Sequence, residues 1–292
     1  MTIDSHAHVA RTMTGFWQPL RYGKISEGGE VRQLFPPSFD PTSSPPEVLL
    51  GYLDDAGVGR AFLVQHHMYG DQNETVLECL RTWPDRFVGY AYLGKMDQPD
   101  AADQLQALIE AGMLGLKVEV ASTRRLRPDF RFDGERELKI WERLNQLKRP
   151  IALDLIASPP NDVTALREVF DAFPDLKFVN CHVGGPVGPG WRDRALLAKN
   201  PNGWVDLAVA TMVERDEEYP FPKAQEFVRW AVDTFGADRI MWGTDYPPVL
   251  RRATYRQLLD WVRKHCDFLT DEQRALILGG TAEQYLAGFG LR

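Results

Sequence analysis

The chain has 292 residues, of which 44% are hydrophobic and 26% charged, and this composition is that of an ordinary folded protein and excludes a disordered one. The net charge of -7 provides no positive surface for nucleic acid or for an anionic membrane. Because the apolar runs stay well below about 18 residues and the chain opens directly on a polar motif, we expect a cytoplasmic protein without a membrane span. Three cysteines without CxxC spacing are typical of reduced thiols.

The first ten residues contain a possible metal-binding motif. Asp4, His6 and His8 follow a short apolar start, and side chains two apart on a strand point to the same side. The two imidazoles can therefore reach one point in space, which suits Zn²⁺ or a similar divalent ion, and Asp4 can orient one of them. Two exposed histidines at a polar N-terminus would show the same pattern. The residues at the other strand ends must therefore decide whether this motif is a metal site.

A long segment rich in glycine and proline follows at residues 11–46. A segment of this length without regular structure is usually functional or disordered. Its aromatic side chains, such as Phe16, Trp17 and Phe35, indicate packing against the rest of the molecule. We therefore predict an irregular but ordered active-site loop.

From residue 46 onward, apolar stretches of strand length alternate with amphipathic stretches of helix length. The predicted strands are the opening segment and residues 60–65, 87–92, 115–119, 151–155, 177–181, 204–209 and 240–242. The predicted helices cover residues 46–57, 72–82, 99–111, 135–148, 162–172, 191–199 and 223–235, and three more, near 254–265, 271–278 and 281–287, close the chain. Eight such units predict an α/β protein with one (β/α)₈ barrel domain over residues 1–292. The alternative, a doubly wound open sheet, would need a glycine-rich phosphate turn after an early strand, and none follows the first two.

In a (β/α)₈ barrel the chemistry lies at the carboxyl ends of the strands. Five of the six histidines fall at these predicted ends, and only His265, within a predicted helix, does not. The polar side chains expected there are His6, His8, Gln65, His66, His67, Tyr69, Lys117, Glu119, Asp154, His182 and Asp245. Random placement would rarely gather them in this way, so an active site is indicated.

Several of these side chains also have a structural interpretation. Lys117 and Glu119 could form an ion pair inside the barrel mouth. His66 and His67 are adjacent, so at most one of them can face the centre. His182 could be a core histidine before a glycine-rich bend, and Asp245 could cap the turn that follows its strand.

Five segments in this order and spacing carry a resemblance to a known family. They are residues 4–8 (DSHAH), 63–73 (LVQ with YGDQN), 173–185 (FPDLK leading to CHVGG), 242–247 (WGTDYP) and 277–282 (ILGGTA). The chain resembles the amidohydrolase superfamily, in particular the branch of aminocarboxymuconate semialdehyde decarboxylase-like and pyrone-dicarboxylate lactonase-like proteins. The resemblance covers nearly the whole chain.

The resemblance implies roles for four residues. His6 and His8 would be metal ligands, His182 the histidine near the substrate, and Asp245 the acid that binds metal or accepts a proton from water. The metal-dependent members carry a histidine at the end of the fifth strand, where this chain has Asp154. Asp154 can supply an oxygen ligand, but the site then has fewer nitrogens than Zn²⁺ usually prefers. Both one divalent ion, with Zn²⁺ the first choice, and metal-independent action therefore stay open.

The leading hypothesis is a hydrolase that opens a small, carboxylate-bearing lactone or related ester, with Asp245 as general base. His182 and one histidine of the first strand would polarise the carbonyl. The candidate substrate-binding residues are Arg21, Tyr22, Lys24, Gln65, His67, Tyr69 and Lys117, and Arg124 and Arg125 are further cations expected in loops or strand ends on that side.

Two other functions are kept as alternatives: a metal-dependent non-oxidative decarboxylase, and a barrel without activity that serves as a binding protein. The aromatic side chains of the last helices, Trp261, Phe268, Tyr285 and Phe289, allow a homodimer, although core packing explains them equally well.

Overall fold

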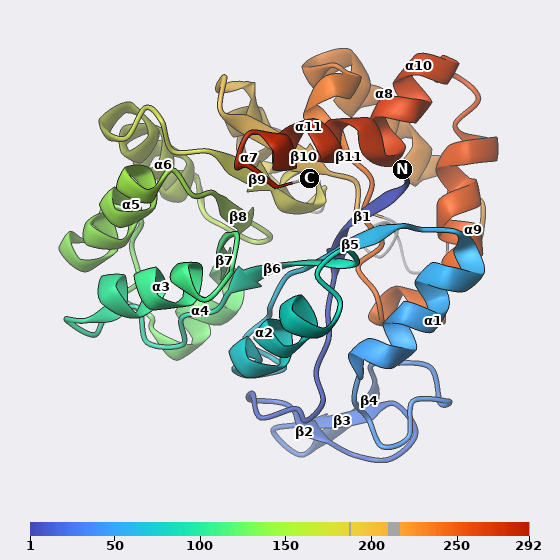
Figure 1. The fold of residues 1–292 in the computed structure, drawn as a ribbon, viewed down its shortest axis with the longest axis horizontal. Coiled ribbons are helices and arrows are strands. Elements are labelled where there is room, and N and C mark those ends of the chain that lie inside the picture. Colours follow the sequence, from blue (N-terminus) through green and yellow to red (C-terminus); the bar gives the residue numbers. More distant parts are fainter. Residues whose placement is uncertain (187, 210–216, 292) are drawn as a thin grey trace.

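Eight parallel strands form the centre of the computed structural model, which describes residues 1–186, 188–209 and 217–291. In sheet order they are β1 (Ile3–Ala7), β5 (Arg60–Leu63), β6 (Phe87–Ala91), β7 (Gly115–Glu119), β8 (Ile151–Asp154), β9 (Phe178–Asn180), β10 (Gly203–Asp206) and β11 (Ile240–Met241). The first and last strands close the circle, because the Ser5 N–H donates to the Trp242 carbonyl at 2.8 Å and the His8 N–H donates to that of Tyr246 at 2.9 Å. The predicted (β/α)₈ barrel is confirmed (Figure 1).

Helices alternate with these strands along the chain and surround them (Figure 1). They are α1 (Pro46–Ala56), α2 (Asn73–Thr82), α3 (Ala101–Glu110), α4 (Val120–Leu126), α5 (Glu135–Leu147), α6 (Pro160–Ala172), α7 (Trp191–Leu196), α8 (Pro222–Phe235), α9 (Tyr255–Asp260), α10 (Asp271–Ala275) and α11 (Thr281–Ala287). The short helical segments between them are η1 (Cys181–Gly184), η2 (Leu197–Lys199), η3 (Ala237–Arg239), η4 (Pro248–Arg251), η5 (Trp261–His265) and η6 (Leu276–Gly280). Among the described residues, none of these helices is long and apolar enough to cross a membrane.

Helix α4 was not predicted, and it changes the setting of two arginines. It starts directly after β7, and the Glu119 carboxylate caps it by accepting a hydrogen bond from the Ser122 N–H at 2.9 Å. The sequence of α4 is short and rich in small and β-branched residues, so this cap decides the helix more than propensity does. Arg124 and Arg125, expected in a loop or at a strand end, therefore lie on a helix.

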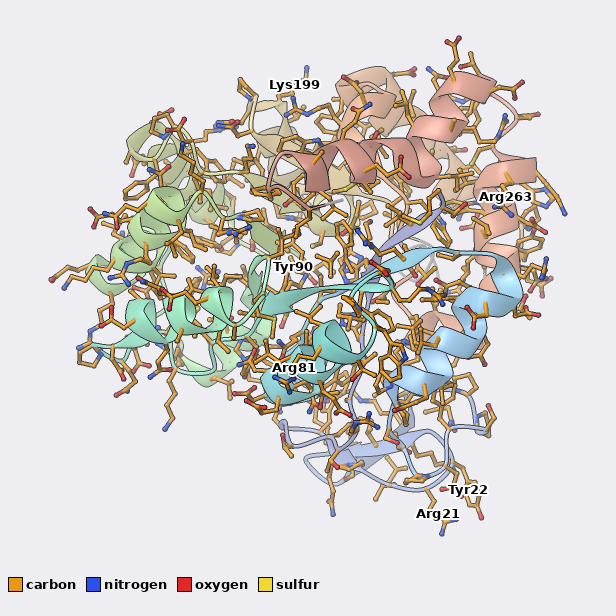
Figure 2. All side chains as sticks on the ribbon, in the orientation of Figure 1. Arg21, Tyr22, Arg81, Tyr90, Lys199 and Arg263 are labelled. Carbon is orange, nitrogen blue, oxygen red and sulfur yellow. The ribbon has the colours of Figure 1, made fainter. Side chains whose placement is uncertain are left out.

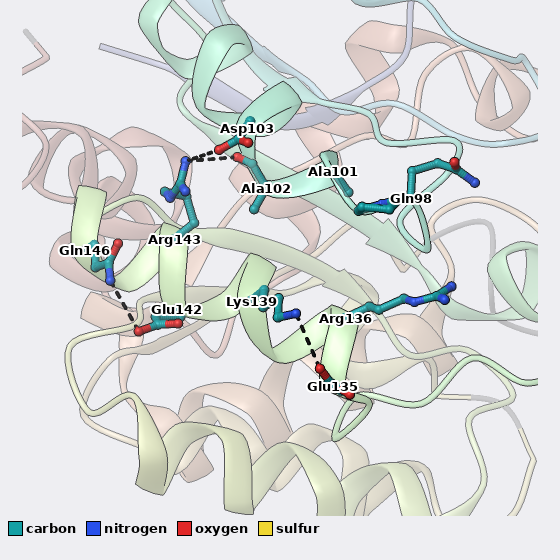
Figure 3. A pocket seen from close by; sticks show the side chains of 11 residues that line it. Gln98, Ala101, Ala102, Asp103, Glu135, Arg136, Lys139, Glu142, Arg143 and Gln146 are labelled. Carbon is teal, nitrogen blue, oxygen red and sulfur yellow. Dashed lines mark hydrogen bonds and ion pairs between the residues drawn. The ribbon is translucent and has the colours of Figure 1, made fainter.

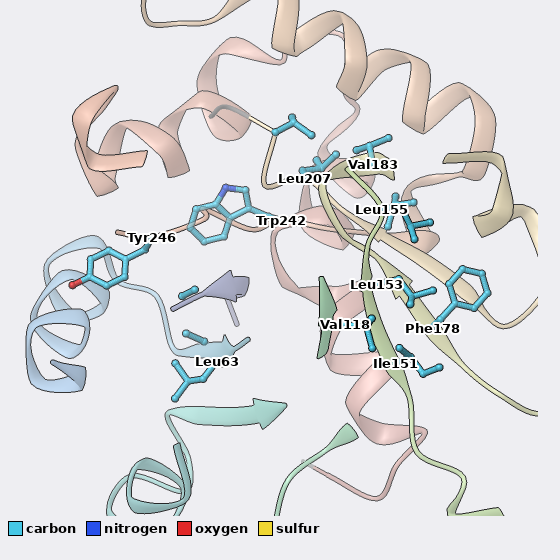
Figure 4. Close-up of a cluster of buried hydrophobic side chains, with 14 of the residues drawn as sticks. Leu63, Val118, Ile151, Leu153, Leu155, Phe178, Val183, Leu207, Trp242 and Tyr246 are labelled. Atoms are coloured by element: carbon cyan, nitrogen blue, oxygen red, sulfur yellow. The ribbon is translucent and has the colours of Figure 1, made fainter. Parts of the chain in front are cut away.

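Each barrel strand has two buried faces, because successive side chains point to opposite sides. Phe62 and Val64 belong to the set that fills the barrel, and Tyr285 of α11 covers one end of this set, with its hydroxyl 2.8 Å from that of Tyr90. Leu63 and Leu153 belong to the set between the strands and the helices, part of which is shown in Figure 4. In the strands without a bulge the two rows alternate residue by residue, which fixes the inward positions.

Residues 18–33 form a small antiparallel sheet rather than the irregular structure that we expected for residues 11–46. Its strands are β2 (Gln18–Pro19), β3 (Lys24–Glu27) and β4 (Glu30–Gln33). Gly28 and Gly29, with φ of 59° and 89°, form the two-residue turn between β3 and β4, since such hairpin turns need positive φ. The Gly-Gly pair between two short runs was a readable hairpin signal. In Figure 1 the small sheet lies beneath α1 and α2, at the end toward which β1 runs.

Strand β1 contains a bulge that separates Asp4 from the two histidines. Asp4 pairs with Ala61 but Ala7 pairs with Leu63, so β1 holds one extra residue between these points. A bulge of this kind redirects the side chains that follow it. Asp4 therefore does not orient a histidine ring: it accepts hydrogen bonds at 2.6 Å from the hydroxyls of Thr244 and Tyr255.

Candidate active site

Six side chains from the strand ends surround one point at the mouth of the barrel. We call them the polar ring: His6, His8, His66, Asp154, His182 and Asp245. The closest contact joins His8 Nε2 to Asp245 Oδ1 at 3.0 Å, and His6 Nε2 lies 3.9 Å from the same oxygen. All six are largely buried, and the most exposed side chains among them are Asp245 at 12% and His66 at 11%.

The other members of the polar ring continue this circle. The rings of His6 and His182 are 4.5 Å apart, and His182 Nε2 lies 3.4 Å from Asp154 Oδ2. Asp154 is grouped in turn with His66 and Glu119, with candidate ligand atoms within 4.8 Å of one another. The imidazole of His66 is 6.1 Å from that of His8, and this contact closes the circle of six side chains.

Two members of the polar ring adopt a left-handed backbone. His182 has φ of 56° and Asp245 has φ of 62°, and the β-branched Val183 has φ of 51°. Such positions cost about 1–3 kcal/mol each and persist only when neighbouring structure enforces them. Here the Asp245 N–H donates to the His6 carbonyl at 2.8 Å, and the His182 N–H donates to Asp206 at 2.8 Å. The fold therefore holds both side chains in place at an energetic cost.

The hydrogen bonds of Nδ1 fix the orientation of three rings. His8 Nδ1 donates to the Val64 carbonyl at 2.7 Å and His182 Nδ1 to the Ala208 carbonyl at 2.7 Å, because a carbonyl oxygen can only accept. His6 Nδ1 lies 2.9 Å from Asp206 Oδ2. In His6, His8 and His182, Nε2 is therefore the nitrogen that faces the other members of the polar ring.

Asp206 is a part of the site that sequence reasoning missed. It ends β10, and its carboxylate serves His6 Nδ1 and the backbone N–H groups of His182 and Ala208. The signal was present, since Asp206 ends the seventh strand as Asp154 ends the fifth. Its partner His6 lies 200 residues away in the chain, so only the folded structure shows the pairing.

His66 has the opposite arrangement. The backbone N–H of Met68 donates to His66 Nδ1 at 3.2 Å, so a neutral His66 ring carries its proton on Nε2. This nitrogen lies 3.6 Å from Glu119 Oε2. His66 therefore presents an N–H group where a neutral His6 or His8 presents a lone pair.

Burial and neighbouring charges divide the polar ring into charged and neutral groups. Burial lowers the pKa of His6 to about 4, against the opposing charge of Asp206. Burial also disfavours a charged His182, but the carboxylates of Asp154, Asp245 and Asp206 outweigh it and raise the pKa of His182 to about 9. Near neutral pH His182 is thus an imidazolium, and His6 is a neutral ring.

The carboxylates of the polar ring are ionised. Burial works against ionisation of Asp154, yet the charges of His182 and Lys117 lower its pKa below the ordinary value. Burial likewise opposes ionisation of Asp245, but the hydrogen bond from His8 and the charge of His182 lower its pKa. An ionised Asp245 beside an imidazolium is suited to accept a proton from water.

The residues His6, His8 and Asp245 fit a divalent metal ion. Their candidate ligand atoms lie within 4.8 Å of one another, and the two rings are held from behind by Asp206 and by the Val64 carbonyl, as metal-bound histidines usually are. In neutral His8 the Nε2 lone pair faces an Asp245 oxygen at 3.0 Å, and two acceptors this close need a proton or a cation between them. The donor set therefore suits a divalent ion such as Zn²⁺.

Asp154, predicted as a fourth ligand, lies in a different group of candidate ligands, with His66 and Glu119. A ring whose Nδ1 accepts a hydrogen bond cannot offer a lone pair on Nε2 while it is neutral. His66 is thus unsuited to complete a second metal site with Asp154 and Glu119 in this tautomer.

Two further predicted residues reach the polar ring. The Tyr69 ring is 5.4 Å from the His8 ring and buried. Lys117 is buried as well, and its Nζ contacts Cys181 Sγ at 3.1 Å instead of pairing with Glu119. Burial disfavours the charged Lys117 amine, but Cys181 and the nearby carboxylates of Asp154 and Asp206 raise its pKa above the ordinary value.

The remaining predicted residues lie elsewhere. Arg21 pairs with Asp40, Tyr22 is 55% exposed and Lys24 is exposed on β3; Figure 2 shows Arg21 and Tyr22 at the outer edge of the small sheet. His67 contacts the hydroxyls of Tyr92 and Thr123, at 2.7 and 2.8 Å, and Gln65 donates to Asn73 and to the Tyr90 carbonyl. Arg124 and Arg125 pair with Asp162 and Glu27. The structure thus brings His66, and not His67, to the centre.

A separate hollow lies between α3 and α5, and no member of the polar ring lines it. Four of its charged side chains form ion pairs (Figure 3), Arg143 with Asp103 and Lys139 with Glu135. It offers none of the chemistry of the barrel mouth.

Comparison with known families identifies the chain. The sequence profile of the amidohydrolase family matches residues 3–287. The chain belongs to this family. The predicted membership is therefore confirmed.

A curated relative gives a first indication of chemistry. An L-fucono-1,5-lactonase from Burkholderia ambifaria is 31% identical over 147 residues, which are 47% of this chain. The match spans only about half, 50%, of the length of that lactonase.

Solved structures share the whole fold. An amidohydrolase from Burkholderia multivorans, crystallised with HEPES, is 18% identical over 100% of both chains with a TM-score of 0.76, and another crystal form of it contains zinc. A Pseudomonas putida protein assigned as a 2-pyrone-4,6-dicarboxylic acid hydrolase is 22% identical over 99% of this chain and 97% of its own, with a TM-score of 0.70. A 2,6-dihydroxybenzoate decarboxylase from Rhizobium covers 82% of this chain and 88% of its own at 17% identity and a TM-score of 0.60. At these identities the likeness concerns the fold alone.

Proposed function

We propose that this amidohydrolase hydrolyses a small lactone that bears a carboxylate. The observation that carries the proposal is the ionised, buried Asp245, which the backbone holds in a strained conformation beside His8 and near the imidazolium of His182. The partial match to an L-fucono-1,5-lactonase supports this reaction class.

In the proposed reaction, Asp245 accepts a proton from water as the water oxygen attacks the lactone carbonyl. The imidazolium of His182 donates a hydrogen bond to the carbonyl oxygen, whose negative charge grows during attack. Collapse of the tetrahedral intermediate breaks the ring C–O bond and gives a hydroxy acid. Both groups are already ionised and oriented by the fold, so little reorganisation is needed.

We further propose that His6, His8 and Asp245 hold a divalent ion, with Zn²⁺ the first choice. When bound, such an ion polarises a carbonyl and lowers the pKa of water from about 15.7 towards about 7. Support comes from the donor set itself and from the zinc present in the Burkholderia multivorans amidohydrolase. Asp206 and the Val64 carbonyl would then orient the two rings from behind.

An anionic substrate needs a cation near the polar ring, and we propose Lys117 for this role. Its ammonium group is buried beside the centre, where a carboxylate would be a strong partner. Arg21, Tyr22 and Lys24 sit on the small sheet at the barrel mouth, and their proposed role is limited to an outer contact with the substrate. The cysteines Cys79, Cys181 and Cys266 are free and buried, which supports a reducing compartment such as the cytoplasm as the proposed location.

The direct test is a substrate panel of L-fucono-1,5-lactone, 2-pyrone-4,6-dicarboxylate, simple δ-lactones and hydroxybenzoates, with acid release and CO₂ both followed. We expect acid release without CO₂, and Asp245→Asn should lower the rate by about 10²–10⁴-fold without loss of fold. CO₂ release from an aromatic acid would establish the decarboxylase alternative instead. A near-normal rate for Asp245→Asn would remove this residue from the mechanism.

A further inference from the structure

We propose that His66 is a catalytic residue that donates a hydrogen bond from Nε2–H to the oxygen that leaves when the lactone ring opens. This inference rests on the lactonase function proposed above. It adds a second electrophile to the polar ring, distinct from His182, which acts on the carbonyl oxygen.

The position of His66 follows from its contacts. His66 lies three residues after β5, its ring is 6.1 Å from that of His8, and its Nε2 lies 3.6 Å from Glu119 Oε2. Both ring nitrogens of His67 are already bonded to the hydroxyls of Tyr92 and Thr123. Of the adjacent pair, His66 is therefore the one available to a substrate at the centre.

The proton position makes His66 a donor. Because the Met68 N–H occupies the lone pair of His66 Nδ1, the neutral ring must carry its hydrogen on Nε2. The rings of His6 and His8 are held in the opposite way, with Nδ1 turned to Asp206 and to the Val64 carbonyl. The Nε2 lone pairs of neutral His6 and His8 and the Nε2–H group of His66 therefore all face the other members of the polar ring.

The Nε2–H group of His66 lacks a hydrogen-bond acceptor among the described residues. Its nearest carboxylate oxygen, on Glu119, is 3.6 Å away, which is longer than a hydrogen bond, and this oxygen already accepts from the Ser122 N–H at 2.9 Å. The His66 side chain is 11% exposed, so this N–H group can be reached by a ligand. A ligand oxygen bound in the polar ring would satisfy it.

Opening of the lactone ring requires a group that stabilises negative charge on the leaving oxygen. Attack forms the bond between the water oxygen and the carbonyl carbon, and Asp245 takes one water proton. Collapse restores the carbonyl and breaks the ring C–O bond, so negative charge develops on the leaving oxygen until the proton held by Asp245 reaches it. A neutral imidazole N–H can stabilise such developing charge without being transferred.

His8 lies between the two groups that act in these steps. Its Nε2 is 3.0 Å from Asp245, and its ring is 6.1 Å from that of His66. A lactone seated over His8 would therefore have the base near the attacking water and the His66 N–H near the ring oxygen.

The test compares two lactones that differ in their leaving oxygen. δ-Valerolactone releases an alkoxide whose conjugate acid has a pKa near that of water, about 15.7, whereas dihydrocoumarin releases a phenolate with a value of about 10. We expect His66→Phe to lower kcat/KM by about 10²-fold or more for δ-valerolactone and far less for dihydrocoumarin. His66→Gln, which keeps an N–H near the Nε2 position, should restore much of the loss, and His265→Gln is the matched control.

Equal losses on both lactones would overturn the inference, because a merely structural role does not depend on the leaving group. If His66→Phe fails to fold, His66→Asn replaces it, since its shorter amide does not reach the Nε2 position. Wild-type protein that opens neither these lactones nor those of the panel would overturn the proposed function itself. That result is obtained before any His66 variant is made, so the two failures are distinguishable.

Discussion

At the scale of single residues, the site depends on which nitrogen of each histidine carries the proton. Asp206 fixes this for His6 and also holds the backbone of His182. It touches no reacting atom in the proposed mechanism and acts by positioning the two rings.

We predict that Asp206→Asn lowers kcat/KM and zinc affinity by about 10–100-fold, because the amide no longer offers a charged acceptor to His6. Lactone kinetics and isothermal titration with Zn²⁺ measure the two effects. Circular dichroism should show an intact fold. Unchanged zinc affinity together with unchanged kinetics would mean that Asp206 does not position these rings.

His67 gives a prediction for stability against pH. Burial lowers its pKa from 6.5 to about 4, so between these values the unfolded chain binds more protons than the folded protein. The stability that neutral His67 contributes is present above pH 6.5 and is lost as the pH falls towards 4, by up to about 3 kcal/mol.

Urea unfolding at several pH values measures this loss. His67→Gln, which does not titrate, should show a shallower fall in the free energy of unfolding between pH 6.5 and 4 than the wild type. His265→Gln serves as the control. Parallel curves for His67→Gln and the wild type would contradict the prediction.

At the scale of secondary structure, the bulge in β1 does two tasks. It turns Asp4 towards α9 and the segment after β11, and it leaves His6 and His8 directed at the polar ring. Asp4 thereby fastens the first strand to the last part of the barrel, at the point where the circle closes.

We predict that Tyr255→Phe lowers the free energy of unfolding by about 1.5–3 kcal/mol, because the Tyr255 hydroxyl donates to the buried Asp4 carboxylate. Denaturant titration measures the change. Tyr285→Phe removes a hydroxyl that, among the described residues, is bonded to that of Tyr90 alone, so it is a matched comparison and should cost about 1 kcal/mol. A smaller loss for Tyr255→Phe than for Tyr285→Phe would show that the Asp4 contact does not fasten the barrel.

At the scale of the whole molecule, barrel closure brings β1 and the segment after β11 together, and with them His6, His8 and Asp245. The proposed metal site exists only in the folded chain, since its ligands come from opposite ends of the sequence. Metal binding should therefore be coupled to global stability.

We predict that Zn²⁺ at about 100 times its Kd raises the free energy of unfolding by about 2.7 kcal/mol. Thermal unfolding of chelator-treated protein, with and without added Zn²⁺, measures this without reference to activity. His8→Asn should abolish the shift, and His265→Gln should keep it. An unfolding temperature of the wild type that does not change on addition of Zn²⁺ would contradict the proposed metal site.

The sequence by itself determined the barrel and most of the polar ring. Apolar runs of strand length are local features, and parallel strands bring their carboxyl ends to one edge, so His6, His8, His182 and Asp245 could be grouped without a structure. Even the hairpin at Gly28 and Gly29 could be predicted from the sequence, because its turn depends on two adjacent residues.

Only the tertiary structure decided which neighbours these side chains meet. The bulge that separates Asp4 from His6 depends on pairing with β5. The choice of His66 over His67 depends on contacts with distant side chains, with His8 for His66 and with Tyr92 and Thr123 for His67. The role of Asp206 and the pairing of Arg21 with Asp40 appear only once the chain is folded. Proton positions and ion pairs are set by contacts between distant residues, and a local pattern contains no information about such contacts.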